Sequence, residues 1–264
     1  MIHGLLGWGE ESPLWGRAPS YYPLERLRKQ WTRGPLVAVD VGVASSNHDR
    51  ACEAYAQLRG RITDYGADHA EAHGHLRFGE DYTGRGRLGV WDALHPVHLV
   101  GHSFGGNTAV ALTAMLASDF WGDGTDASWV VSVTCIASPL CGCSLPYAFG
   151  LDPPDECTHH QRPLVPRRAT LLLRIVFALI GVVDFLQRKF PPLRLFGLRH
   201  SQWAAHHSLR AYLTLNHPLL TSADSLLVDA TPAASSRALK TTLASLGGTY
   251  LIAVTSGTLP PLRT

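Results

Sequence analysis

Apolar residues along this chain fall into short β-branched runs and longer runs with little polar interruption. Residues 35–41, 97–100 and 129–136 are short and rich in valine, which is typical of strands buried in a parallel sheet. Residues 49–58 and 108–116 have helical length, and the second run is apolar almost all round, as expected for a helix packed on the centre of a sheet. Strand and helix signals alternate, which predicts an α/β fold with a mostly parallel, doubly wound sheet.

The strand predicted at residues 97–100 runs directly into a serine with glycines two positions away on each side. Gly101, Ser103 and Gly105 form the G-x-S-x-G pattern of a nucleophile elbow, a tight turn from strand to helix that exposes the serine hydroxyl. In that interpretation Ser103 is the nucleophile, and the backbone N–H of Phe104 stabilises the oxyanion formed during acyl transfer. A purely structural glycine turn is the alternative.

The first nine residues include a glycine-rich stretch at residues 3–9 and lack the basic and apolar regions of a signal peptide. In hydrolases with this kind of elbow, such a loop supplies a second oxyanion donor, here the N–H of Leu5. An ordinary surface loop is the alternative. The strand expected before His3 is missing in this interpretation, because only two residues precede it.

Residues 65–79 are rich in side chains that bind metals. The candidates are Asp68, His69, Glu71, His73 and His75. Imidazole and carboxylate groups suit zinc, which takes four such ligands in a tetrahedron. On composition alone, a solvated polar loop explains the same residues.

An apolar run at residues 169–186 lies between Arg167-Arg168 and Arg188-Lys189. It approaches the length of a membrane span, but Arg174 and Asp184 inside it argue against one, because a charge at the bilayer centre costs about 2.5–3.5 kcal/mol on insertion scales. We interpret the run as a lid helix whose apolar face covers the Ser103 cleft and opens onto a lipid surface. A buried core helix and a membrane anchor are the alternatives.

Composition narrows the class of protein. A chain of 264 residues with 45% hydrophobic and 17% charged residues is expected to form a single domain, residues 1–264. The net charge of +2 and the absence of a basic run interleaved with aromatic residues argue against a nucleic-acid partner. Five cysteines without a C-x-x-C pair indicate neither a disulfide scaffold nor a zinc ribbon.

Three segments near the N-terminus resemble the zinc-containing lipases of Bacillus and Geobacillus and their staphylococcal relatives. They are residues 3–9 (HGLLGWG), 45–58 (SSNHDRACEAYAQL) and 64–79, which contain D-Y-G-A-D-H, H-G-H and R-F-G. The resemblance implies an α/β-hydrolase with a zinc-binding loop, a helical lid inserted at residues 140–195, and acylglycerol substrates met at a lipid–water interface. It also implies secretion.

The resemblance further implies a zinc ligand set. By matching motif positions, the ligands are Asp49, His69 and His75, and His73 falls outside the pattern. The fourth ligand in the family is an aspartate before Gln-Trp, where this chain has Ser201, so His200 is the substitute that we predict. A calcium site is left undecided.

The catalytic acid and base of the family come from its C-terminal part. Here no Asp or Glu follows Asp229 and no His follows His217, so we expect neither group within this chain. Either the chain is a lipase truncated at both ends, without its first and C-terminal strands, or it is a divergent protein that has lost catalysis. The first interpretation predicts a serine ester hydrolase that is inactive in isolation, and the second a lipase-like protein that binds lipid surfaces.

Overall fold

The computed structural model describes residues 1–11, 13–150, 170–190, 193 and 195–255. The described residues form five strands in two sheets. One sheet pairs β1 (Ile62–Asp64) with β2 (Phe78–Asp81), and the other contains β3 (Val97–His102), β4 (Val130–Ile136) and β5 (Tyr250–Val254). The α-helices are α1 (Pro13–Gly16), α2 (Leu24–Gln30), α3 (Asn47–Arg59), α4 (Ala67–His73), α5 (Phe104–Ala117), α6 (Leu145–Ala148), α7 (Leu171–Lys189), α8 (Leu209–Leu213), α9 (Pro218–Thr221), α10 (Leu226–Asp229) and α11 (Pro232–Leu243). Two 3-10 helices are η1 (Ala127–Trp129) and η2 (Ser201–His206).

The larger sheet is parallel, in the order β3-β4-β5. Leu99 faces Val133 on β4, and Val133 faces Leu251 on β5. Ile2 extends this sheet beyond β3, because it forms parallel bridges with both Gly101 and Val39. The alternation of strands and helices read from the sequence is therefore present, and the fold is α/β.

The predicted strand at residues 35–41 is wrong as a continuous strand. Its side chains are buried as expected at Ala38, Val39 and Val41, but only Val39 forms a bridge. The neighbouring segment, residues 1–3, turns away at Leu5 and Leu6, so it is too short for a continuous ladder. In the same segment Ile2 forms single bridges with Val39 and with Gly101 of β3 but no strand, so the expectation of a missing first strand stays a prediction.

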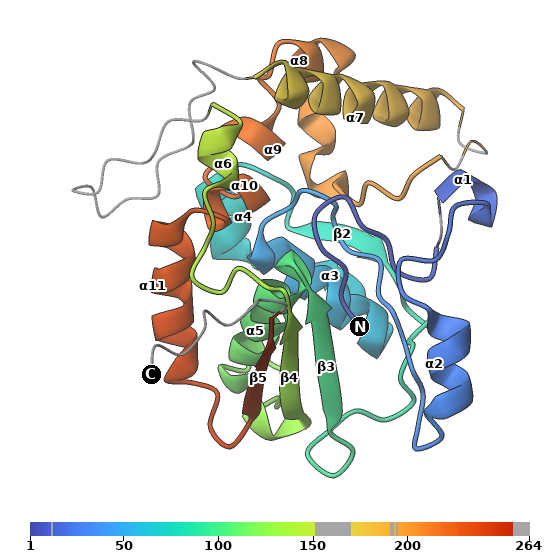
Figure 1. The fold of residues 1–264 in the computed structure, drawn as a ribbon, viewed down its shortest axis with the longest axis vertical. Coiled ribbons are helices and arrows are strands. Elements are labelled where there is room, and N and C mark those ends of the chain that lie inside the picture. The colour runs from blue at the N-terminus through green and yellow to red at the C-terminus, as the bar shows by residue number, and fades with distance from the viewer. Residues whose placement is uncertain (12, 151–169, 191–192, 194, 256–264) are drawn as a thin grey trace, which may run out of the picture.

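Helices α3 and α5 pack against each other and, with the sheet, enclose the main core (Figure 1). The side chains that meet there include Ile2, Cys52, Leu112, Leu116 and Val133, each nearly inaccessible to solvent. α11 packs on α5 from the outside. This packing fixes the position of the turn between β3 and α5, where Ser103 lies.

Helix α7 belongs to a separate layer beyond the carboxyl ends of the strands (Figure 1). It packs on α8, and its inward side chains Leu173, Phe177 and Ile180 join a second apolar cluster with Trp203 and Tyr212. Of the proposed lid insertion, residues 151–169, 191–192 and 194 lie outside the described residues. No helix within the described ranges is long and apolar enough to cross a membrane.

Candidate active site and metal centre

The elbow has the geometry that its sequence predicts. Ser103 lies between β3 and α5 with φ 53° and ψ −129°, a backbone conformation that residues with a Cβ rarely adopt. Its N–H donates to the carbonyl oxygen of Ile136 at 2.8 Å, which ties the turn to the end of β4. The elbow therefore projects the Ser103 side chain beyond the sheet.

The glycines of the elbow are required by close backbone contacts. A Cβ on Gly105 would overlap the carbonyl oxygen of Ile2, and a Cβ on Gly101 would overlap the backbone of Gly105. Gly4 has a similar role across the site, because a Cβ there would lie 2.8 Å from the Cβ of Ser103. The glycines let three backbone segments approach one another at the serine.

Two backbone N–H groups beside Ser103 are available as donors. Phe104 is the first residue of α5, so its N–H has no partner within the helix. Among the described residues the N–H of Leu5 donates no backbone hydrogen bond, and the Leu5 side chain packs with Phe104. This pair fits the predicted oxyanion donors.

No described hydrogen bond joins the Ser103 hydroxyl to a histidine. His102, next to it in sequence, turns its ring to Tyr21, with the Tyr21 hydroxyl 2.6 Å from His102 Nδ1. The described part of the chain thus contains the candidate nucleophile and two candidate oxyanion donors, and none of its histidines forms a hydrogen bond with the Ser103 hydroxyl.

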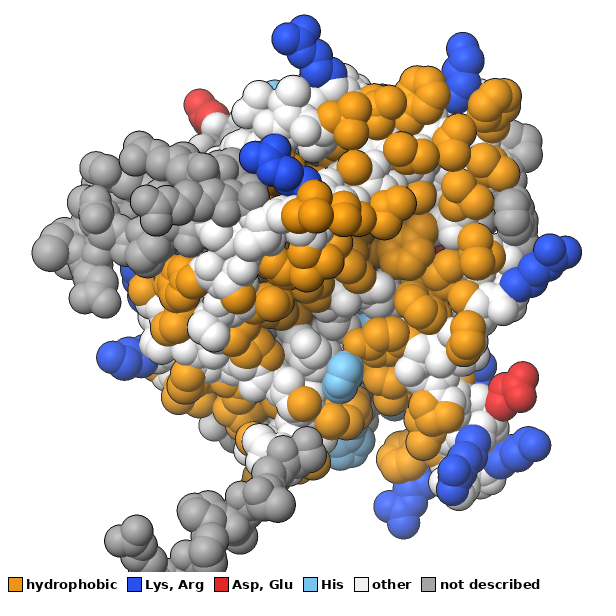
Figure 2. All heavy atoms as spheres, turned by 45° about the horizontal axis from the view of Figure 1, so that its top comes forward, with side chains coloured by type: hydrophobic (Ala, Val, Ile, Leu, Met, Phe, Trp, Pro, Cys, Tyr) orange, Lys and Arg blue, Asp and Glu red, His pale blue; other side chains and the backbone are white. Residues whose placement is uncertain are grey.

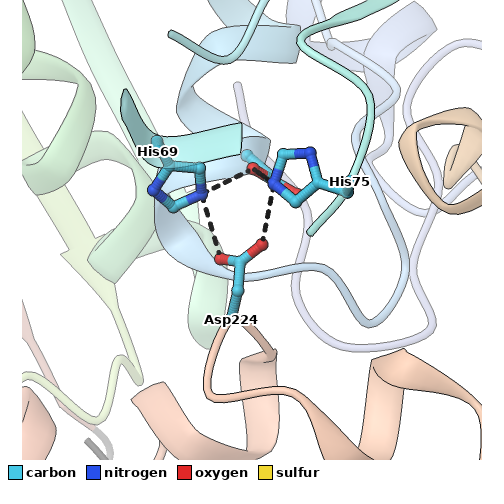
Figure 3. Close-up of side chains that lie close together, drawn as sticks. His69, His75 and Asp224 are labelled. Carbon is cyan, nitrogen blue, oxygen red and sulfur yellow. Dashed lines mark ion pairs between the residues drawn. The ribbon is translucent and has the colours of Figure 1, made fainter. Parts of the chain in front are cut away.

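Three of the four predicted zinc ligands come together, in a cluster that we call the metal centre. It consists of Asp49 on α3, His69 on α4, His75 just after α4, and Asp224 just before α10 (Figure 3). Asp49, His75 and Asp224 have side chains at most 1% exposed, and that of His69 is 17% exposed. Helix α3 and the α4 segment are joined by β1, whose pairing with β2 holds the two histidines toward Asp49.

Donor atoms in the metal centre have the spacing of ligands around one ion. His69 Nε2 lies 3.3 Å from Asp49 Oδ1 and 3.4 Å from Asp224 Oδ1, and His75 Nε2 lies 3.4 Å from Asp224 Oδ2 and 3.9 Å from Asp49 Oδ1. A tetrahedral zinc with bonds of about 2.0–2.1 Å separates its ligands by about 3.3 Å. The measured distances therefore leave room for an ion between the four side chains.

Hydrogen bonding orients these side chains and leaves their inner atoms without partners. His75 Nδ1 donates to the Leu76 carbonyl oxygen at 2.8 Å, and Gln202 Nε2 donates to Asp49 Oδ2 at 2.6 Å. Asp49 Oδ1, His69 Nε2, His75 Nε2 and Asp224 Oδ2 have no hydrogen-bond partner although they are buried. Unpaired buried donors and acceptors are costly, so this donor set fits a bound zinc ion.

The charged side chains of the metal centre shift one another's pKa values. Burial, together with the charge of Asp224, raises the pKa of Asp49 to about 6. Burial lowers the pKa of His69, but the nearby carboxylates of Asp224 and Asp49 outweigh it and raise this pKa to about 9. Burial raises the pKa of Asp224, yet its contacts with His69 and His75 bring it below the usual range. The site thus holds two buried carboxylates that need positive charge.

His200 is not part of the metal centre, and this prediction is wrong. It lies with Asp184 and His207 in a different cluster, and Asp224 takes the fourth place. The Gln-Trp pair lies close to the metal centre but supplies no ligand. Gln202 donates a hydrogen bond to Asp49, and the Trp203 ring packs on the His75 ring with 4.9 Å between centroids. The sequence offered one signal that could have identified Asp224 as the fourth ligand: Asp224 and Asp229 are the only acidic residues after His217.

Two further histidines lie against His69 without joining the ligand set. The His48 ring stacks on it at 3.6 Å between centroids, and the His73 ring lies at 4.5 Å. His48 Nε2 donates to the Tyr65 carbonyl oxygen, which fixes the stacked ring. His73 is outside the cluster, as the motif positions predict.

Comparison with known proteins finds lipases. Residues 24–125 match the family described as lipase-like, C-terminal domain. Lipase 2 of Staphylococcus aureus is 41% identical over 113 residues, which covers 40% of this chain and 16% of that protein. The lipase of Staphylococcus hyicus is 39% identical over 157 residues, which covers 52% of this chain and 24% of that protein. The chain thus matches less than a quarter of the length of these curated relatives.

Solved structures extend the similarity to most of the fold. The crystal structure of Staphylococcus hyicus lipase has a TM-score of 0.63 at 25% identity and covers 91% of this chain and 62% of that one. EstA from Clostridium botulinum has a TM-score of 0.63 at 24% identity and covers 90% and 55%. This chain is therefore similar to the staphylococcal lipases, in sequence over about half of its length and in fold over most of it.

Proposed function

We propose that this chain carries the nucleophile and oxyanion region of a lipase that cleaves carboxylic esters of acylglycerols. The observation that carries the proposal is the Ser103 elbow, with the N–H groups of Leu5 and Phe104 beside it. The Ser103 hydroxyl oxygen would attack the ester carbonyl carbon, and the two N–H groups would stabilise the negative charge that develops on the carbonyl oxygen. We expect such a protein to act outside the cell, as its resemblance implies.

Zinc bound by Asp49, His69, His75 and Asp224 is the second part of the proposal. When bound, zinc would supply a closed structural link between α3, the α4 segment and the residues before α10. The four orphaned buried atoms support this assignment.

A lid role for α7 is the third part. Its outward side chains Leu171, Leu172, Ile175, Leu179, Val182 and Phe185 are exposed. They recur every three or four residues, so they form one apolar face. Figure 2 draws hydrophobic side chains gathered over this region, with Lys and Arg side chains around them. Such a face suits a lipid–water interface.

The proposal is tested by labelling with a fluorophosphonate, which reacts with activated serines. We expect the peptide that contains Ser103 to gain the probe mass and Ser103→Ala to lose it. The control Ser118→Ala, at the other end of α5, should still label. Because no described histidine contacts Ser103, labelling of this chain should be slow, on the order of 10⁴–10⁶-fold below that of a complete triad.

A non-catalytic lipid-binding protein is the second candidate, favoured by the absence of a described histidine in contact with Ser103. Folded protein that binds phosphatidylcholine vesicles but leaves Ser103 unlabelled after prolonged exposure to the probe would establish this candidate and refute the hydrolase.

A further inference from the structure

A second group of potential metal ligands lies under α7, apart from the metal centre. We call it the α7 cluster, and it consists of Asp184 on α7, His200 just before η2 and His207 just after η2. All three side chains are nearly inaccessible to solvent, at 4–7% exposure. The proposed function uses none of them.

One carboxylate oxygen faces both imidazoles. Asp184 Oδ1 lies 3.1 Å from His200 Nε2 and 3.7 Å from His207 Nδ1. Its other oxygen, Oδ2, lies 2.7 Å from the guanidinium of Arg188. Arg188 thus orients the carboxylate from outside, and Oδ1 faces the two rings, within hydrogen-bond distance of His200 Nε2.

The hydrogen bond made by His207 Nε2 determines whether the other ring nitrogen, Nδ1, carries a proton. His207 Nε2 lies 3.1 Å from the carbonyl oxygen of His200, which can only accept, so Nε2 carries the proton. In the neutral ring Nδ1 then carries no proton, and its lone pair faces the carboxylate oxygen Oδ1 of Asp184. Two lone pairs that face each other in a buried site repel, and either a proton or a metal ion between them removes the repulsion. An imidazole whose outer N–H is held by a backbone carbonyl is also the usual arrangement of a metal ligand.

We infer that Asp184, His200 and His207 form a second zinc site. Their donor separations of 3.1 and 3.7 Å lie on either side of the roughly 3.3 Å expected between ligands of a tetrahedral zinc. Two imidazoles and one carboxylate suit zinc better than calcium or magnesium, which take oxygen ligands. The hydroxyl of Tyr212, 3.1 Å from His200 Nε2, lies next to the remaining coordination position.

Zinc at the α7 cluster would attach α7 to both ends of η2. The two histidines flank η2, and the aspartate lies on the buried side of α7. The ion would thus fix the helix in the layer beyond the sheet. This inference does not depend on esterase activity.

Zinc content, measured by elemental analysis of tag-free protein after dialysis against buffered zinc, tests the inference. We expect two zinc ions per wild-type chain, one in Asp184→Asn/His207→Gln, and one in His75→Gln/Asp224→Asn, which removes only the metal centre. His206→Gln changes an exposed histidine beside the cluster and should keep two.

A second measurement avoids variants that fail to fold. Wild-type protein loaded with ¹¹³Cd should give two cadmium resonances, and both should be lost on adding a chelator. One zinc per wild-type chain that folded Asp184→Asn/His207→Gln retains would overturn the α7 site, as would two zinc ions retained in that variant. Loss of zinc confined to the His75→Gln/Asp224→Asn variant would refute the α7 site while leaving the metal centre standing.

Discussion

Ser103 shows how far a single residue depends on the backbone around it. Its φ of 53° and ψ of −129° are strained for a residue with a Cβ, at a typical cost of about 1–3 kcal/mol. Contacts with Gly4, Gly101 and Gly105 hold it there, because each glycine allows a backbone approach that a side chain would block. The glycines are thus as much part of the candidate active site as the serine.

Gly105→Ala should disrupt this arrangement. The new methyl group would overlap the Ile2 carbonyl oxygen, so the residue 1–3 segment or the start of α5 must move. We expect the free energy of unfolding in urea to fall by about 1–3 kcal/mol or more. Gly89→Ala, at an exposed position with nothing within 4 Å of the new methyl, should change it by less than about 0.5 kcal/mol. Equal stability of the two variants would contradict the packing argument.

At the scale of elements, α7 has two apolar faces with different surroundings. Leu173, Phe177 and Ile180 are buried in the apolar cluster that contains Trp203. This face of α7 therefore packs as a core helix does. The opposite side remains exposed. The contacts described for α7 are with α8 and that cluster, and coverage of Ser103 by its apolar face stays a prediction.

Replacing the exposed leucines should separate lipid binding from folding. Leu172→Asp/Leu179→Asp removes two leucines that are 58% and 61% exposed, so the fold should persist. Burying a leucine contributes about 1.5–3 kcal/mol, so binding to phosphatidylcholine vesicles, measured by co-sedimentation, should weaken at least about tenfold. The matched control Leu94→Asp/Leu243→Asp changes two exposed leucines elsewhere. Equal weakening in both double variants would show that α7 is not the binding face.

At the scale of the whole molecule, the metal centre joins segments that are far apart in sequence. Asp49 and Asp224 meet only because α3 and the residues before α10 pack on the same side of the core. A ligand that binds only the folded state stabilises it by mass action. Bound zinc would therefore link α3 and the α4 segment to the residues before α10.

Chelation should lower the melting temperature of the wild-type protein by several degrees, and added zinc should restore it. His75→Gln should show a smaller response, whereas His95→Gln, at an exposed histidine, should respond as the wild type does. The response should shrink from pH 8 to pH 5. Zinc needs deprotonated imidazole, and His69, with its pKa raised to about 9, binds a proton more readily as the pH falls. A melting temperature that ignores the chelator at pH 8 would contradict the zinc assignment.

The sequence by itself determined the features that depend on neighbours in the chain. The G-x-S-x-G spacing predicts the elbow because the turn is built from consecutive residues, and the length and composition of the apolar runs predict α3, α5, β3 and β4. Motif resemblance also selects Asp49, His69 and His75, which the structure brings together. These three residues lie within one segment, so local order places them.

Tertiary packing alone decided the rest. Asp224 completes the metal centre from a distant segment, and His200, adjacent in sequence to the pair that contacts the centre, points into the α7 cluster instead. An apolar run such as residues 169–186 does not reveal which face will be covered, and residues 35–41 do not reveal how long a neighbouring strand will be. Side-chain identity limits what a residue can bind, but which side chains share a site depends on contacts between distant segments, which form only when the core packs.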